Sequence, residues 1–200
     1  MIKNIILDFG DVLINLDKPA TAKAMVQHGF TEITPALEVL FRDYEKGFLN
    51  SSDFLDEVAS HFPDANRDYL IKAWNSILLD FPEHRLEFIE QLARENQYKM
   101  ILLSNTNDLH IEHVKEQMGM ERFNRFKNAF DVFYLSYEMG MRKPDAEIFD
   151  FVLQENRLLA HETFFVDDVA ENTASAADLG IKVWNLQVGK EDITQLKSRL

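Results

Sequence analysis

The sequence predicts an α/β fold in which a doubly wound, mainly parallel sheet carries an inserted four-helix cap. Five short apolar runs are spread along the 200 residues, and amphipathic helical patterns lie between them. Near-continuous apolar strands are typical of sheets covered on both faces, which are usually parallel with helical crossovers. A third observation is a purely helical block directly after the first run, which indicates an insertion in the sheet domain.

The strands of the predicted core are short apolar runs separated by amphipathic segments. We expect strands at Ile5–Leu7, Met100–Leu103, Val132–Leu135, Phe164–Val166 and, from a weaker pattern, Ile181–Trp184. Apolar residues at helical spacing predict core helices at Pro82–Asn96, Leu109–Met118, Ala146–Gln154 and Thr173–Leu179. Gly180 suits the C-terminal cap of the last helix.

The block between the first strand and the rest of the core predicts the cap. Its expected helices are Ala20–His28, Pro35–Lys46, Ser51–Phe62 and Arg67–Leu79, and Ser51 or Ser52 is expected to cap the third. We therefore predict a core at residues 1–15 and 82–200 and a cap at residues 16–81. Aromatic residues at helical spacing should form the cap interior, with Tyr44 and Trp74 as candidates to face a substrate.

Composition narrows the classes of partner. The chain has 21 Lys and Arg against 34 Asp and Glu, a formal net charge of −13, which argues against nucleic-acid and anionic-membrane partners. It has no cysteine, which excludes disulfides, thiolate metal sites and cysteine nucleophiles. The first apolar run is too short for a secretory leader, so we expect a cytoplasmic protein. The oligomeric state stays open.

Polar residues follow three of the predicted strands where each strand ends. Asp8 follows the first strand, Ser104–Asn105–Thr106–Asn107 the second, and Asp167–Asp168 the fourth. Ligands of open parallel sheets bind just outside the carboxyl ends of the strands, so these groups should meet in one crevice. A carboxylate there can act as a nucleophile, and several carboxylates suit Mg²⁺. A dianionic phosphate beside them would need such a cation.

A lysine belongs to the same predicted crevice. The segment GMRKPD places Lys143 before Pro144, which disfavours helix at Lys143 and suits the first turn of a following helix. Lys143 should therefore sit at a loop-to-helix junction, where its ammonium would neutralise carboxylates and a phosphate.

Four segments, in this order, carry a family resemblance: LDFGDVL, LLSNTN, GMRKPDAEIF and FFVDDVAENTASA. Together they resemble the four motifs of the haloacid dehalogenase-like hydrolases, over essentially the whole chain. The resemblance is to the branch with a small helical cap, which includes a bacterial glucose-1-phosphate phosphatase. It implies a Mg²⁺-dependent phosphatase that hydrolyses small phosphorylated metabolites, sugar phosphates among them, through an aspartyl-phosphate.

The resemblance also implies roles for individual residues. Asp8 would be the nucleophile and a metal ligand, together with Asp168, Asp167 and the backbone carbonyl of Gly10. Ser104, Asn105 and Lys143 would bind the phosphoryl group. Asn172 falls where the family often places a supporting acid or amide.

The chain departs from the family pattern two residues after Asp8. A second aspartate, the general acid and base, is usual there, but this sequence has Gly10, with Asp11 one position later. Asp11 is either a displaced acid or, as we favour, a turn residue facing away from the substrate. Two other functions stay open: a 2-haloacid dehalogenase, which needs neither metal nor acid, and a catalytically inactive binding protein.

Overall fold

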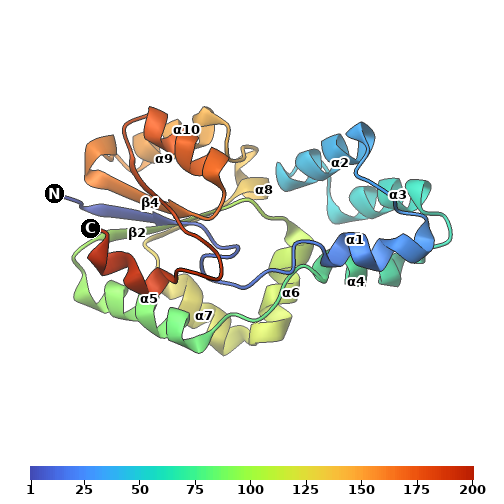
Figure 1. The fold of residues 1–200 in the computed structure, drawn as a ribbon, viewed down its shortest axis with the longest axis horizontal. Helices are drawn as coiled ribbons and strands as arrows, with labels where there is room; N and C mark the ends of the chain where they lie inside the picture. The colour runs from blue at the N-terminus through green and yellow to red at the C-terminus, as the bar shows by residue number, and fades with distance from the viewer.

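The computed structural model describes residues 1–200 and contains one five-stranded sheet (Figure 1). All neighbouring strands pair in parallel, in the order β3-β2-β1-β4-β5. The bounds are β1 Asn4–Leu7, β2 Lys99–Ser104, β3 Val132–Leu135, β4 Thr163–Asp167 and β5 Lys182–Asn185. The doubly wound fold class and all five predicted strands are confirmed.

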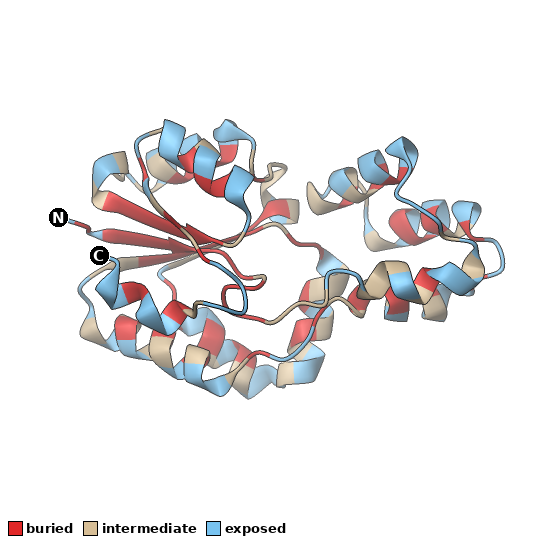
Figure 2. Ribbon diagram, viewed as in Figure 1, coloured by how far each residue is buried: buried red, intermediate tan, exposed pale blue.

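Helices cover both faces of the sheet, as the apolar strands predicted (Figures 1 and 2). Side chains on β1 alternate between two core clusters: Ile5 and Leu7 belong to one, and Ile6 belongs to the other. The first cluster is shared with α5 (Glu83–Glu95), α6 (Asp108–Met118), α7 (Met120–Asn128) and the 3₁₀ segment Ile193–Ser198. The second is shared with α9 (Ala146–Glu155) and α10 (Ala170–Asp178).

Four helices with their own apolar cluster project from the carboxyl-end side of the sheet (Figure 1). They are α1 (Ala20–Met25, continued by a 3₁₀ turn to His28), α2 (Pro35–Glu45), α3 (Ser51–His61) and α4 (Arg67–Asn75). The predicted cap of α3 is wrong by one residue: Asn50 accepts the hydrogen bond from the backbone N–H of Asp53 at 2.9 Å. Asparagine is as good an N-cap as serine.

The helix α4 ends four residues earlier than predicted because the chain there pairs with the linker that leads from β1 into the cap. Asn15 N–H donates to Asp80 O at 2.9 Å, and Leu79 N–H donates to Asn15 O at 2.9 Å. These bonds take backbone groups that a longer helix would have used internally. The two linkers between sheet and cap are therefore tied side by side.

Two helices were not predicted: α7, and the four-residue α8 (Ser136–Met139), which directly follows β3. α7 has only two fully buried side chains, Phe123 and Phe126, so its apolar pattern is short. No helix in the chain combines the length and the apolar character required to cross a bilayer.

Candidate active site

The carboxyl ends of three adjacent strands bring the predicted site residues together. β1 lies between β2 and β4, with Leu7 in register with Leu102 on one side and Val166 on the other. Asp8 therefore follows β1 beside Asp167, the last residue of β4, while the buried Ser104 ends β2. The sheet order explains how residues about 160 positions apart in the chain share one crevice.

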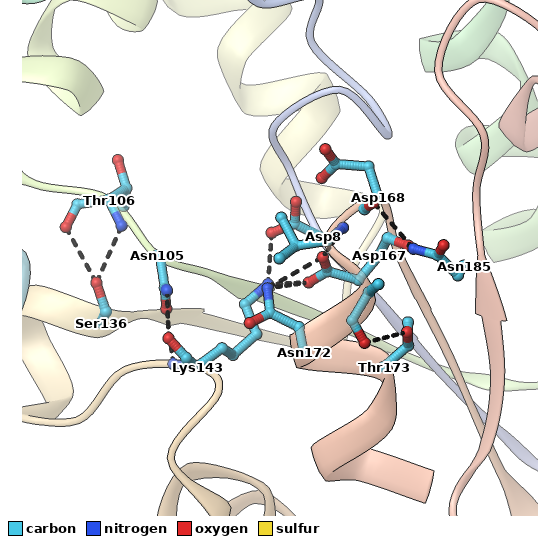
Figure 3. Close-up of polar contacts among 12 residues, drawn as sticks. Asp8, Asn105, Thr106, Ser136, Lys143, Asp167, Asp168, Asn172, Thr173 and Asn185 are labelled. Atoms are coloured by element: carbon cyan, nitrogen blue, oxygen red, sulfur yellow. Dashed lines mark hydrogen bonds and ion pairs between the residues drawn. The ribbon is translucent and has the colours of Figure 1, made fainter. Parts of the chain in front are cut away.

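Lys143 is the centre of the site (Figure 3). Its side chain is only 1% exposed, and its ammonium donates to Asp8 Oδ1 and to Asp167 Oδ2, each at 2.6 Å. A buried ammonium is stable only when its charge is matched by partners of this kind. Lys143 lies before a cis peptide bond to Pro144, and α9 begins at Ala146, slightly later than Pro144 suggested.

Asn105 holds the backbone of Lys143 in place. Its side-chain amide donates to Lys143 O at 2.8 Å, and its carbonyl oxygen accepts from Lys143 N–H at 2.9 Å (Figure 3). Both ends of the amide are thus engaged by the lysine segment. The contact of Asn105 with phosphate remains a prediction, and in this structure its side chain positions Lys143.

Asp167 is saturated by donors from the protein. Besides Lys143, it accepts from the Asn172 amide, 3.0 Å from both carboxylate oxygens, and from Val169 N–H at 2.8 Å. Asn172 itself is buried at the start of α10. This arrangement fixes the orientation of Asp167 toward Lys143, so the direct contact of Asp167 with a metal remains a prediction.

The carboxylates of Asp8, Asp167 and Asp168 lie close together in a largely buried site, which shifts the pKa values of this group. Burial, together with the charges of Asp167 and Asp168, raises the pKa of Asp8 to about 7 against the opposing effect of Lys143. Burial also raises the pKa of Asp168, against the effect of Lys18. Burial lowers the pKa of Lys143, but Asp8 and Asp167 outweigh it and the net shift is upward.

The donor set fits a hard divalent cation. One carboxylate oxygen from each of Asp8, Asp167 and Asp168 lies within 4.8 Å of the others. Burial raises the pKa of both Asp8 and Asp168, and a bound Mg²⁺ would favour the ionised form of each carboxylate. The Gly10 carbonyl accepts from Val12 N–H at 2.7 Å, and its second lone pair remains for a metal.

The contacts of Asp11 and the space beside Gly10 bear on whether Asp11 is a displaced general acid or a turn residue. The Asp11 carboxylate accepts from Leu16 N–H at 3.0 Å and pairs with the Lys18 ammonium at 3.0 Å, and its backbone φ is +55°. Asp11 thus holds a turn together. A Cβ at Gly10 would lie 2.8 Å from Leu16 Cδ1, so an apolar side chain occupies the space beside position 10.

Sequence reasoning missed Lys18 and Ser136. Lys18, on the linker into the cap, places its ammonium 2.5 Å from Asp168 Oδ2. Ser136 lies at the start of α8. Its hydroxyl donates to Glu45 O at 2.6 Å and accepts from Thr106 N–H at 2.9 Å, which joins the cap to the core. A single lysine or serine has no sequence pattern, so only the folded chain reveals these contacts.

Known protein families and individual proteins that are similar to this chain match it over most of its length. Residues 2–180 match the model of the hydrolase family described as haloacid dehalogenase-like hydrolase. A D-ribitol-5-phosphate phosphatase from Bacteroides thetaiotaomicron is 27% identical over 197 residues, covering 96% of this chain and 95% of the relative.

Solved structures of a HAD family enzyme from the same organism are also similar. One is 36% identical with a TM-score of 0.88 and covers 98% of each chain. Another, a wild-type complex with magnesium and inorganic phosphate, is 34% identical with a TM-score of 0.82, covering 96% of this chain and 97% of that one.

Proposed function

Because this chain belongs to the haloacid dehalogenase-like hydrolases, we propose that it is a Mg²⁺-dependent phosphatase of small phosphate monoesters. The observation that carries the proposal is the buried Lys143 ammonium held between Asp8 and Asp167, beside a third carboxylate at Asp168. That geometry provides a nucleophile, a cation for the phosphoryl group and oxygen ligands for a metal in one crevice.

The reaction would proceed in two displacements at phosphorus. An Asp8 oxygen forms a bond to phosphorus while the ester P–O bond breaks and the alcohol oxygen leaves with the bonding electrons. Water then attacks the aspartyl-phosphate, which releases inorganic phosphate and regenerates the Asp8 carboxylate. Lys143 favours the ionised form of Asp8 and offsets phosphate charge in both displacements.

Asp8, Asp167, Asp168 and the carbonyl of Gly10 are the residues that would hold Mg²⁺, and Asp167 also orients Lys143 beside them. The metal, when bound, neutralises phosphate oxygens and so favours attack by an anionic nucleophile. Structures of the Bacteroides relative in complex with magnesium and inorganic phosphate support this part of the proposal.

The leaving alcohol needs a proton that position 10 does not supply. A positioned general acid typically contributes about 10²- to 10⁴-fold to such reactions. Since Gly10 has no side chain and Asp11 is engaged by Leu16 and Lys18, the proton would come from solvent. Activity should therefore depend strongly on the leaving group, and an anomeric sugar phosphate would need the acid less than an ordinary alkyl phosphate.

The relative's substrate makes phosphorylated polyols and sugars the first compounds to compare. The cytoplasmic location remains part of the proposal. The net charge of −13 supports the proposal that neither nucleic acid nor an anionic membrane is a partner. The carboxylate group at Asp8, Asp167 and Asp168 favours a metal-dependent phosphatase over a 2-haloacid dehalogenase, because attack on carbon needs no cation.

The test is hydrolysis of p-nitrophenyl phosphate and a panel of sugar and polyol phosphates with Mg²⁺. Wild-type protein should turn over, EDTA should abolish the activity, and added Mg²⁺ should restore it. Asp8→Asn should be inactive, whereas Asp178→Asn, a matched change at an exposed position of α10, should be fully active. A wild type no faster than Asp8→Asn would instead indicate an inactive binding protein, and metal-independent chloride release from a 2-chloro acid would indicate a dehalogenase.

A further inference from the structure

An apolar cavity of about 220 Å³ lies inside the cap. All four cap helices contribute to its wall, and 13 of its 17 lining residues are hydrophobic. Among them are Met25, Phe41, Phe54, Val58, Leu70 and Trp74. The space is partly open to solvent, so a small molecule could enter it from outside, as in the concave, mostly apolar pockets that bind ligands.

Two residues that line the cavity, Lys18 and Glu45, also contact residues of the candidate active site. Lys18 lines it and contacts Asp168 at 2.5 Å and Asp11 at 3.0 Å. Glu45 also lines it and pairs with Arg142, the neighbour of Lys143, at 2.9 Å. A molecule with its phosphate at the carboxylates could therefore extend its other end past Lys18 and Glu45 into the cap.

The polar side chains of the wall are already engaged with the protein. Thr21 Oγ1 donates to Trp74 O at 3.3 Å, and His110 Nε2 lies 3.3 Å from the same oxygen. Glu45 and Lys18 are in the ion pairs described above. A polyol placed here would bury hydroxyl groups without partners, which is costly, whereas an apolar group would match the wall.

We propose that this cavity binds the alcohol part of the substrate, so that the chain acts on phosphate monoesters whose alcohol carries an apolar segment. This inference rests on the proposed phosphatase function and names its substrate class. The expected substrates therefore differ from ribitol 5-phosphate, which is a phosphorylated polyol. Apolar cavities of comparable size, about 150 Å³ in an engineered case, stay dry and bind small hydrocarbons.

The direct test compares substrates of equal carbon number. Ribitol 5-phosphate and n-pentyl phosphate both have five carbons, and glycerol 3-phosphate and n-propyl phosphate both have three. The alkyl ester should have the higher kcat/KM in each pair. From methyl to octyl phosphate, kcat/KM should rise about two- to fourfold per methylene until the cavity is filled. Polyol esters that equal or exceed their alkyl partners would overturn the proposal.

A pair of variants on α1 tests the location. Ala22→Leu puts a larger side chain into the cavity wall, whereas Lys23→Leu puts the same side chain on the exposed face of the same helix. Ala22→Leu should lower kcat/KM for octyl phosphate about tenfold or more and leave methyl phosphate unchanged. Lys23→Leu should change neither. Equal losses on both substrates, or no loss in a variant with a wild-type thermal unfolding curve, would refute the assignment.

Binding of n-octylphosphonate separates this inference from the catalytic proposal. Trp74 lines the cavity, and Trp184→Phe leaves it as the sole tryptophan, so its fluorescence reports occupancy. A saturable change lost in Ala22→Leu supports the cavity even if no ester is hydrolysed, in which case only the phosphatase proposal fails. Hydrolysis of p-nitrophenyl phosphate without octylphosphonate binding or chain-length dependence would support the phosphatase and overturn the cavity assignment.

Discussion

Restoring the family's second aspartate at position 10 should destabilise this protein, because Leu16 occupies the space. In Gly10→Asp the new Cβ would lie 2.8 Å from Leu16 Cδ1, where non-bonded carbons prefer about 3.5–4.0 Å. Overpacking in a core typically costs about 1–3 kcal/mol, and because Cδ1 is the far end of a half-buried, flexible side chain, we expect a cost at the lower end, about 1 kcal/mol. The new carboxylate would also lie beside Asp8, with its Cβ 3.9 Å from Asp8 Oδ2, and raise the Asp8 pKa further above about 7.

Shortening Leu16 should relieve the clash. Leu16→Ala removes the Cδ1 methyl that meets position 10, so the double variant should be more stable than the sum of the single changes predicts, by about 1 kcal/mol. With the acid accommodated, turnover of alkyl phosphates should rise by about tenfold or more over Gly10→Asp alone, since a positioned acid typically contributes about 10²- to 10⁴-fold.

Urea unfolding of the four proteins in the cycle gives the coupling free energy, and alkyl phosphate hydrolysis gives the catalytic effect. Gly10→Ala is the control, because it adds the same Cβ without a charge and should show the clash alone. The reasoning is refuted if Gly10→Asp unfolds at the wild-type urea concentration, or if the two changes are additive.

Three further outcomes are expected. Lys143→Met should abolish activity and lower the free energy of unfolding by about 3–5 kcal/mol at neutral pH, because Asp8 and Asp167 are left without the ammonium in a buried site. Urea unfolding measures this loss, and a loss below about 1 kcal/mol would contradict the prediction. Burial lowers the pKa of His110 from its ordinary value of 6.5 to about 4. Between these pH values the imidazole is protonated in the unfolded state but not in the folded state, so the free energy of unfolding should fall by up to about 3 kcal/mol as the pH drops from 6.5 to 4. Comparing wild type with His110→Gln isolates that loss, and parallel pH–stability curves would refute it. Asn105→Ala removes two hydrogen bonds to the Lys143 backbone, so kcat should fall up to about hundredfold with the thermal transition retained; an unchanged kcat would show that the lysine is positioned by other contacts.

Much of the fold was readable because local pattern and global fold agree. Each strand is a short apolar run between polar segments, and four core helices carry apolar residues at helical spacing. The predicted bounds failed where a tertiary contact competes with local preference. α4 stops at Asn75 because Leu79 pairs with Asn15 of the other linker, a bond between residues 64 positions apart that no local pattern encodes.

The sequence by itself determined which chemistry-bearing residues end the strands: Asp8, Ser104, Asp167 and Asp168, with Lys143 before a proline. These positions follow from chain order and strand polarity, which place the carboxyl ends of parallel strands at one edge.

Only the tertiary structure decided how these groups share their partners. Lys143 bridges Asp8 and Asp167, and the Asn105 side chain hydrogen-bonds the backbone of Lys143. Leu16 occupies the space beside Gly10. The cap cavity could not be predicted from the sequence either. A cavity depends on how four helices pack together, and not on the apolar spacing of any one of them. Partner choice and empty space are properties of residues distant in sequence, and only the folded chain brings those residues together.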